Sequence, residues 1–317
     1  MLSRVADSLY WMSRYLERAE HTARLLEVQL NTMLDDPSQT TLDRWRRVLL
    51  TLNHPLPGER TDDYGMMFLL AFDSHNEQSI IYTIGAGREN ARQIREMISS
   101  EMWMQINSLY LFVKGSSLDK IWNNQPGEFL RAVREGAHLF QGITDGTMVR
   151  NEGWHFIRLG RAIERAIAII DLIDVQFSNL PQEPATALSL EAYSEWLSFL
   201  KYLTAFEAYC KVYDADLRVD RIARFLLYHP LFPHALRFNI EEAYSAVEAI
   251  AEETGHGRQT RLMRSMGRLR SALSYDDVDE VMPDIHNYLN QLKRQCSQIH
   301  TDIYEEYIYR RIDSALS

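Results

Sequence analysis

Apolar residues recur at steps of three and four along nearly the whole chain, and this spacing restricts it to helical folds. The first segment shows the pattern at Leu2, Val5, Leu9, Met12, Leu16, Ala19, Ala23, Leu26 and Leu30. Such steps place the side chains on one stripe of a long α-helix. No sustained alternation of apolar and polar residues occurs, so we expect essentially no sheet. The sequence predicts an all-α fold, a multi-helix bundle in which an internal pseudo-repeat of long helices is one interpretation.

Interruptions of this pattern divide the chain into expected helices. The first ends near Asp35-Asp36-Pro37, and Gly85 and Gly87 are expected to interrupt a later one. Further helices are expected at 42–52, 64–72, 79–113, 128–143, 153–177, 189–213, 218–228, 239–254, 258–274 and 277–312. The stretch 178–186 contains two prolines and reads either as a linker between halves 1–177 and 187–317 or as a short helix connection. We expect one all-helical domain over 1–317.

Composition excludes several classes of function. The 317 residues carry a net charge of -10, which argues against a broad nucleic-acid-binding surface. Cys210 and Cys296 lack the spacing of a zinc site or a disulfide framework. No apolar run is long enough to span a bilayer, and no apolar leader opens the chain. The expected location is therefore the cytoplasm, with neither a membrane nor nucleic acid as partner.

A charged heptapeptide occurs twice on helical segments. It reads Ser13-Arg14-Tyr15-Leu16-Glu17-Arg18-Ala19 and Gly160-Arg161-Ala162-Ile163-Glu164-Arg165-Ala166, with the copies 147 positions apart (160 minus 13). Both have the form small-Arg-x-apolar-Glu-Arg-Ala. In the first helix, helical neighbour spacing pairs Glu17 with Arg14 or His21, and Glu20 with Arg24. For that helix alone, a solvated charged face is the favoured interpretation.

The second copy lies in a helix that is apolar on nearly every side. Ile157, Ile167 and Ala168 stand where the first copy has Tyr10, Glu20 and His21. A helix that is apolar all round is normally central, and charges buried there must be paired. Gly160 lowers helix stability by roughly 1 kcal/mol relative to alanine. We expect this glycine to allow close approach by another helix or a ligand.

The constant offset predicts that the two heptapeptides face each other as a pseudo-symmetric pair. Two glutamates and four arginines would then converge, either in a closed salt-bridge lattice or in an anion pocket. Arginine suits carboxylate and phosphate because its planar fork binds bidentately. The anion-binding candidates are Arg14, Arg18, Arg161 and Arg165. The catalytic residue, if there is one, is unknown, with Glu17 and Glu164 as candidates for a general base.

A third charged stretch is a further candidate wall of this pocket. Arg88, Arg92 and Arg95 share one helical stripe just after Gly85 and Gly87. A helix that started near these glycines would offer free N–H groups to an anion. The alternative is an exposed basic stripe paired with Glu89, Glu96 and Glu101.

Three short Glu-x-x-His patterns raise the question of a metal. They are Glu135 with His138, Glu152 with His155, and Glu253 with His256. Helical bundles hold di-iron with paired motifs of this kind and two further glutamates. Because the pattern is short and two copies contain glycine near expected helix ends, we expect no metal site.

Three motifs in order resemble the bacterial alpha-E family over nearly the whole chain. They are Leu9 to Glu20, Arg88 to Arg92, and His155 to Ala166, joined by Arg224-Phe225-Leu226-Leu227 and Phe232-Pro233. Members of that family are all-helical and are typically encoded beside, or fused to, a circularly permuted ATP-grasp protein. A transglutaminase-like protease is often nearby, which suggests a system that forms or modifies peptide-like amide bonds.

The resemblance implies an accessory or substrate-binding component of such a system, without a cofactor of its own. Its partners would be the ATP-grasp protein and an anionic or carboxylate-bearing small molecule or peptide. The site residues that it implies are Arg14, Glu17, Arg18, Arg88, Asn90, Arg92, Arg161, Glu164 and Arg165. The alternatives are a stand-alone enzyme that uses Glu17 or Glu164 as general base, and a non-catalytic helical scaffold.

Overall fold

The computed structural model describes residues 1–33, 41–56, 62–178, 190–255 and 260–309, and every regular element in these ranges is helical. The elements are α1 (Ser3–Met33), α2 (Thr41–Thr51), α3 (Asp63–Met67), η1 (Phe68–Phe72), α4 (Ile80–Gln93), η2 (Arg95–Met97), α5 (Ser100–Gly115), α6 (Leu118–Asn123), α7 (Pro126–Thr147), α8 (Glu152–Phe177), α9 (Leu190–Tyr202), α10 (Phe206–Tyr213), α11 (Val219–Tyr228), α12 (Leu236–Thr254), α13 (Arg261–Tyr275), α14 (Val278–Val281), η3 (Met282–Asp284), α15 (Ile285–Ile303) and η4 (Tyr304–Ile308). The predicted all-α class is confirmed.

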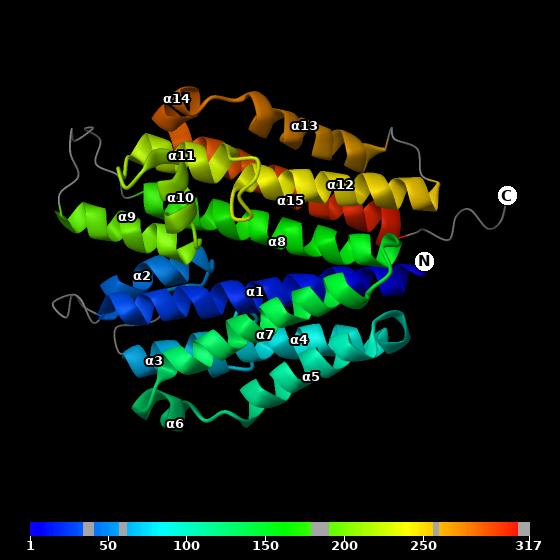
Figure 1. Ribbon diagram of the computed structural model, residues 1–317, viewed down its shortest axis with the longest axis horizontal. Helices are drawn as coiled ribbons and strands as arrows, with labels where there is room; N and C mark the ends of the chain where they lie inside the picture. Colours follow the sequence, from blue (N-terminus) through cyan, green and yellow to red (C-terminus); the bar gives the residue numbers. More distant parts are fainter. Residues whose placement is uncertain (34–40, 57–61, 179–189, 256–259, 310–317) are drawn as a thin grey trace.

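Helices α1 and α8 form the centre of the bundle. Figure 1 shows them side by side along the long axis of the molecule, beginning at the same end and running in the same direction. Helices α4 and α7 pack on α1, and α5 packs on both of these. On the other side, α12 and α15 pack on α8, and α13 covers them. Both heptapeptides therefore lie on the innermost pair of helices.

The core follows the periodicity of the sequence. The expected stripe of α1 is buried, from Leu9 and Met12 through Leu16 to Ala23. In α8 the apolar residues are buried on several sides, including Phe156, Leu159, Ile163 and Ile170. Burial of one apolar side chain of this size stabilises a fold by roughly 1.5–3 kcal/mol. These two helices therefore contribute much of the stability of the fold.

The expected helix over 79–113 is wrong in one respect. It is two helices, α4 and α5, and the break falls at Ile94–Ser99 rather than at the glycines. The Ser99 side chain accepts a hydrogen bond from the backbone N–H of Met102 and so caps a new helix. Gly85 and Gly87 lie inside α4. The free N–H groups expected beside them are therefore absent, because α4 starts after Ser79.

Three other boundaries differ from the expectation. The segment 189–213 is divided between α9 and α10 at Thr204, whose φ is 49°. The segment 277–312 is broken near Pro283, because proline cannot donate the hydrogen bond that a helix interior needs. The short helix α6 had no counterpart among the expected elements. The proposed linker, beyond Ser178, lies outside the described residues.

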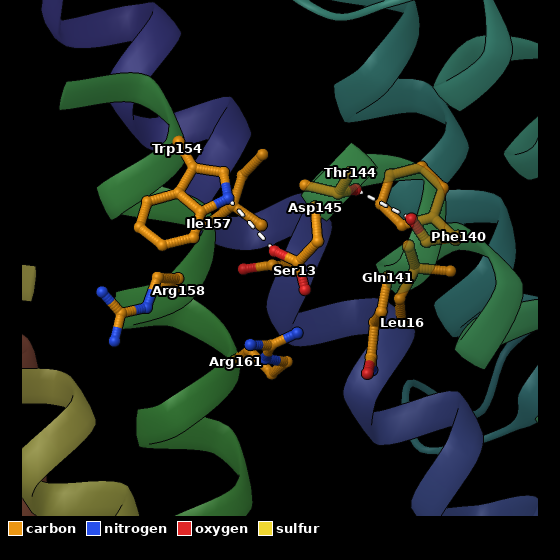
Figure 2. A pocket seen from close by; sticks show the side chains of 10 residues that line it. All are labelled: Ser13, Leu16, Phe140, Gln141, Thr144, Asp145, Trp154, Ile157, Arg158 and Arg161. Carbon is orange, nitrogen blue, oxygen red and sulfur yellow. Dashed lines mark hydrogen bonds between the residues drawn. The ribbon is translucent and has the colours of Figure 1, made fainter. Parts of the chain in front are cut away.

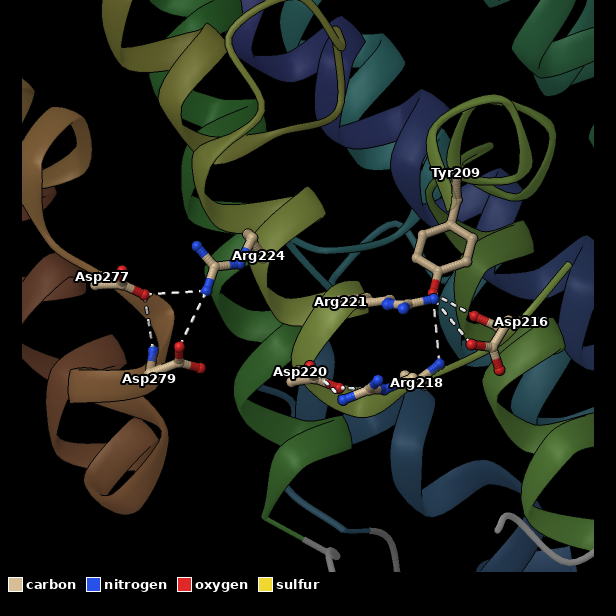
Figure 3. A network of polar contacts seen from close by, with 8 residues as sticks. All are labelled: Tyr209, Asp216, Arg218, Asp220, Arg221, Arg224, Asp277 and Asp279. Atoms are coloured by element: carbon tan, nitrogen blue, oxygen red, sulfur yellow. Dashed lines mark hydrogen bonds and ion pairs between the residues drawn. The ribbon is translucent and has the colours of Figure 1, made fainter. Parts of the chain in front are cut away.

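Charged residues also connect elements at the surface, as Figure 3 shows for α11. Arg224 reaches across to Asp277 and Asp279 at the start of α14, at 3.0 and 3.3 Å. Arg218 and Asp220 pair within the same stretch. All of these side chains are substantially exposed, and pairs of this kind contribute roughly 0–1 kcal/mol each. This network orients α14 but adds little to stability.

Hydropathy gives no sign of a bilayer-spanning element: among the described residues, every helix is too short or too polar to cross a membrane.

Candidate functional site

The two heptapeptides face each other where α1 and α8 touch. A β-carbon at Gly160 would collide with the Ser13 Oγ atom and with the backbone oxygen of Tyr10. Because one of these atoms belongs to the backbone, a side chain at position 160 cannot be accommodated by a change of rotamer. The expected role of Gly160 is confirmed: it lets another helix come into backbone contact.

Two ion pairs join α1 to α8 through equivalent residues of the two heptapeptides. Arg18 Nε lies 2.6 Å from Glu164 Oε1, and Arg165 Nε lies 2.5 Å from Glu17 Oε1. The partners are 146 and 148 positions apart, close to the offset of the repeat. Each Glu-Arg sequence therefore binds the other, as expected for parallel helices related by a pseudo-twofold axis.

Arg14 extends the cluster on one side. Its Nε atom donates to Glu164 Oε2 at 2.7 Å, so Glu164 has an arginine on each oxygen. Its Nη1 atom donates to the hydroxyl of Tyr10 at 3.3 Å and to Nδ1 of His300 at 3.1 Å. The guanidinium also lies 4.5 Å from the centre of the Trp11 ring. A carboxylate, a hydroxyl, an imidazole and an aromatic ring thus hold Arg14 in place.

Arg161 is the counterpart of Arg14, and here the symmetry fails. Glu17, which would be its partner, instead binds Arg165 with both oxygens and accepts from Gln141 Nε2 at 3.3 Å. The position that holds Tyr10 in the first copy holds Ile157 in the second. In the described part of the chain, Arg161 has neither a hydrogen bond nor an ion pair. Four arginines have converged on two glutamates, and one of the four is unpaired.

The cluster is buried on both helices. Arg14, Glu17 and Glu164 are 6%, 2% and 8% exposed. The solvated face favoured for α1 is therefore wrong, because α4, α7 and α8 surround that helix. Glu17 pairs across the interface with Arg165 rather than with Arg14 or His21, and it is at least as buried as Glu164. The expected pair of Glu20 and Arg24 is confirmed.

The electrostatics follow from these pairings. Burial alone would raise the pKa of Glu164, but Arg14 and Arg18 outweigh it and lower the pKa to about 2. Burial would lower the pKa of Arg165, yet Glu17 raises it. For Arg161, burial lowers the pKa and the neighbouring charge of Arg165 lowers it further, and Glu17 only partly offsets both. Its surroundings therefore disfavour the charged form of Arg161, whereas they favour that of Arg165.

A small cavity of about 20 Å³ lies beside Arg161, which is space for roughly one water-sized group. Figure 2 shows the side chains that surround it, from α1, α7 and α8. They are Ser13, Leu16, Phe140, Gln141, Thr144, Asp145, Trp154, Ile157, Arg158 and Arg161. Sequence reasoning missed Gln141 and Asp145, because they come from α7, which has no copy of the motif.

The third charged stretch does not reach this cavity. Arg88 Nε donates to Asn107 Oδ1 at 2.7 Å, and its guanidinium lies over the rings of Trp103 and Tyr110. Asn90 donates to the backbone of its own helix, at Ala86. Arg92 pairs with Glu89 on the surface, and Arg95 lies over Trp103. Arg88 therefore holds α4 against α5, Asn90 and Arg92 bond within α4, and none of the three lines the cavity beside Arg161.

The Glu-x-x-His patterns are dispersed in the fold. His138 pairs with Glu20 of α1 at 3.3 Å rather than acting with Glu135. His256 lies outside the described residues. Within the described ranges, no group of three or more histidine, cysteine, aspartate or glutamate side chains is arranged to hold a metal ion.

Two partly buried histidines make stability depend on pH. Burial lowers the pKa of His21 and of His300 from 6.5 to about 4. Between these values the unfolded chain binds protons that the native protein does not, so the free energy of unfolding should fall as pH drops from 6.5 towards 4. His21 Nε2 is buried without a hydrogen bond. His21→Leu should therefore flatten this dependence, measured by urea unfolding across the range.

The matched control is His75, which is 95% exposed at its side chain. His75→Leu should leave the pH dependence unchanged. An equal slope in the wild type and His21→Leu would contradict the assignment to His21.

Comparison with known proteins gives one family and a few distant relatives. A family model described as "a predicted alpha-helical domain with a conserved ER motif" matches residues 1–308. Glu17-Arg18 and Glu164-Arg165 are two Glu-Arg sequences within that range. An uncharacterized protein of Mycobacterium bovis and one of Mycobacterium tuberculosis CDC 1551 are each 22% identical over 309 residues, and one of M. tuberculosis H37Rv is 21% identical.

These matches cover 89% of this chain and 34% of each relative, so the chain spans about a third of the length of the curated relatives it matches. No solved structure is significantly similar to it.

Proposed function

Because the chain belongs to the Alpha-E family, we propose that it is an accessory or substrate-binding component of an ATP-grasp-linked system that forms or modifies peptide-like amide bonds, with Arg161 as its anion-binding residue. The observation that carries this proposal is the broken symmetry of the cluster. Arg14, Arg18 and Arg165 are held by glutamates, whereas Arg161 lines a cavity and has no partner among the described residues.

The charge balance favours an anionic ligand. The two heptapeptides bring four arginines and two glutamates together, an excess of two positive charges (4 minus 2). A cation that is partly removed from water is unfavourable unless it is paired. A carboxylate placed on Arg161 would supply the missing charge and accept hydrogen bonds from the guanidinium. The small cavity fits the end of a molecule, such as a single carboxylate group, rather than a large anion.

The same geometry favours binding over general-base catalysis. A general base works best when its pKa lies near the operating pH. The pKa of Glu164 is lowered to about 2, and each of its oxygens accepts from an arginine. Both oxygens of Glu17 accept from Arg165. The two glutamates hold arginines in place, so a stand-alone enzyme with either as base is the weaker alternative.

A circularly permuted ATP-grasp protein is the proposed partner, and the ATP-dependent step would belong to it. The support is the likeness of the motifs to a family that is encoded beside such proteins. The curated relatives are about three times as long as the matched region, so this helical unit forms part of larger chains there. Co-purification from cells that express both proteins tests this part, and a clean absence of a complex would contradict it.

The anion site is tested by titration of the full chain with sodium acetate at constant ionic strength. Arg161→Gln should weaken acetate binding by about ten-fold or more, because a hydrogen-bonded charge is removed. Arg92→Gln is the control: it removes an arginine that pairs with Glu89 at the surface and should leave binding unchanged. If Arg161→Gln binds acetate as well as the wild type does, the proposed site is wrong.

A further inference from the structure

Asp145 lines the same cavity as Arg161, and the two are not paired. Oδ1 of Asp145 accepts from Trp154 Nε1 and from Arg150 Nη1, each at 3.2 Å. Its Oδ2 atom has no hydrogen bond within the part of the chain that the structure describes, and no ion pair joins Asp145 to Arg161. In Figure 2 both side chains point into the hollow between α7 and α8. The cavity therefore has one carboxylate oxygen without a hydrogen bond on one wall and an unpaired cation on another.

The two arginines beside this hollow, Arg158 and Arg150, have partners. Arg158 lies 2.5 Å from Glu242 of α12 and stacks on Trp154. Arg150 covers another part of that ring, 4.0 Å from its centre, while it binds Asp145. Among the charged side chains that line the cavity, Arg161 has no described partner, and Asp145 keeps its Oδ2 atom for a ligand while Arg150 and Trp154 share its Oδ1 atom. Asp145 also partly offsets the lowering of the pKa of Arg161, so each side chain lies in the field of the other.

A ligand that satisfies both groups must carry both charges close together. We propose that the cavity binds the head group of an α-amino acid, with its carboxylate on Arg161 and its ammonium on Asp145. This inference rests on the proposed function and names the class of ligand for the same site. In an α-amino acid the two charged groups are attached to one carbon atom, so the carboxylate can enter the cavity while the ammonium stays at its exposed edge beside Asp145. A simple carboxylate leaves the Oδ2 atom of Asp145 without a hydrogen bond, and phosphate brings a second negative charge towards Asp145.

The exposed side of the cavity, at Asp145, determines where the rest of the ligand would lie. The side chains of Asp145 and Arg150 are 48% and 52% exposed, whereas Ser13, Leu16 and Phe140 close the inner wall. The charged head group would enter towards Arg161, and the substituent on the α-carbon would extend past Asp145 into solvent. We therefore expect the site to recognise the carboxylate and the ammonium group and to accept amino acids with different side chains.

Glycine and acetate separate this inference from the proposed function. The full chain is titrated with each at constant ionic strength, and binding is followed by NMR. Glycine should bind about ten-fold more tightly than acetate, because it adds one charged hydrogen bond. In Asp145→Asn, whose side-chain oxygen still accepts from Trp154, the two ligands should bind equally. Arg161→Gln should weaken both. N-acetylglycine, which lacks the ammonium group, should bind the wild type no better than acetate does.

The outcomes differ for the two claims. Equal binding of glycine and acetate by the wild type, or undiminished glycine binding by Asp145→Asn, would overturn the amino-acid assignment and leave the anion site standing. If neither ligand binds the wild type, or Arg161→Gln binds both normally, the proposed function fails as well. The comparison of glycine with N-acetylglycine needs no variant, so it decides the matter even if Asp145→Asn does not fold.

Discussion

Alanine at position 160 is expected to destabilise the protein by about 3 kcal/mol, a large effect for one methyl group. The added β-carbon would meet the Ser13 Oγ atom and the Tyr10 backbone oxygen at distances that folded proteins do not tolerate. Helices α1 and α8 would have to separate at the point where their ion pairs cross. Chemical denaturation of Gly160→Ala against the wild type measures the loss.

Gly142 provides the matched control. It lies within α7, and a β-carbon there would meet no atom within 4 Å. Because alanine is the better helix former, Gly142→Ala should stabilise the protein by roughly 0.5–1 kcal/mol. Removal of the Ser13 side chain should not rescue Gly160→Ala, since the Tyr10 oxygen remains. A Gly160→Ala variant as stable as the wild type would contradict the observed contact between the two helices.

Glu164→Gln is expected to lower the free energy of unfolding by about 3–5 kcal/mol. The substitution keeps the shape of the side chain but leaves Arg14 and Arg18 without their shared carboxylate, and the side chains of these arginines are 7% and 18% exposed. Globular proteins are stable by about 5–15 kcal/mol in total, so this variant should unfold at much lower urea concentration. The protein should bind acetate normally whenever it is folded, because Arg161 is not a partner of Glu164.

Glu89→Gln tests whether burial is the cause. It removes the same charge from a pair in which the side chains of Glu89 and Arg92 are 47% and 58% exposed. Its cost should stay below about 1 kcal/mol. Similar small costs for Glu164→Gln and Glu89→Gln would show that the central pairs are not the buried ion pairs described above.

The spacing of apolar residues predicted most of the helices, and the repeated heptapeptide predicted the contact between α1 and α8. The steps of three and four predicted the buried apolar stripe of α1 and the apolar surface of α8, because these depend on residues close together in the sequence. The 147-residue offset and the single glycine at position 160 were enough to predict that two helices meet there. Even the asymmetry had a signal in the sequence, since Ile157 takes the place of Tyr10, a partner of Arg14.

What could not be predicted depends on segments that are distant in the sequence. The charged side of α1 resembles a solvated surface until α7 and α8 cover it. Gln141 and Asp145 enter the site from α7 through the fold alone. Arg88 belongs to a stripe typical of an anion site, but Asn107, Trp103 and Tyr110 of α5 occupy its guanidinium. The helix break before Ser99 had a local signal, a serine suited to an N-cap, that was weaker than the continuous apolar pattern.

The central claim is that one arginine of the cluster is available to a ligand while three are committed to glutamates. NMR of the arginine Nε–H groups during titration with sodium acetate tests it most directly. The account predicts that the Arg161 signal shifts with added acetate, while the signals of Arg14, Arg18 and Arg165 stay in place. Equal shifts of all four signals, or a change at Arg165 with none at Arg161, would contradict it.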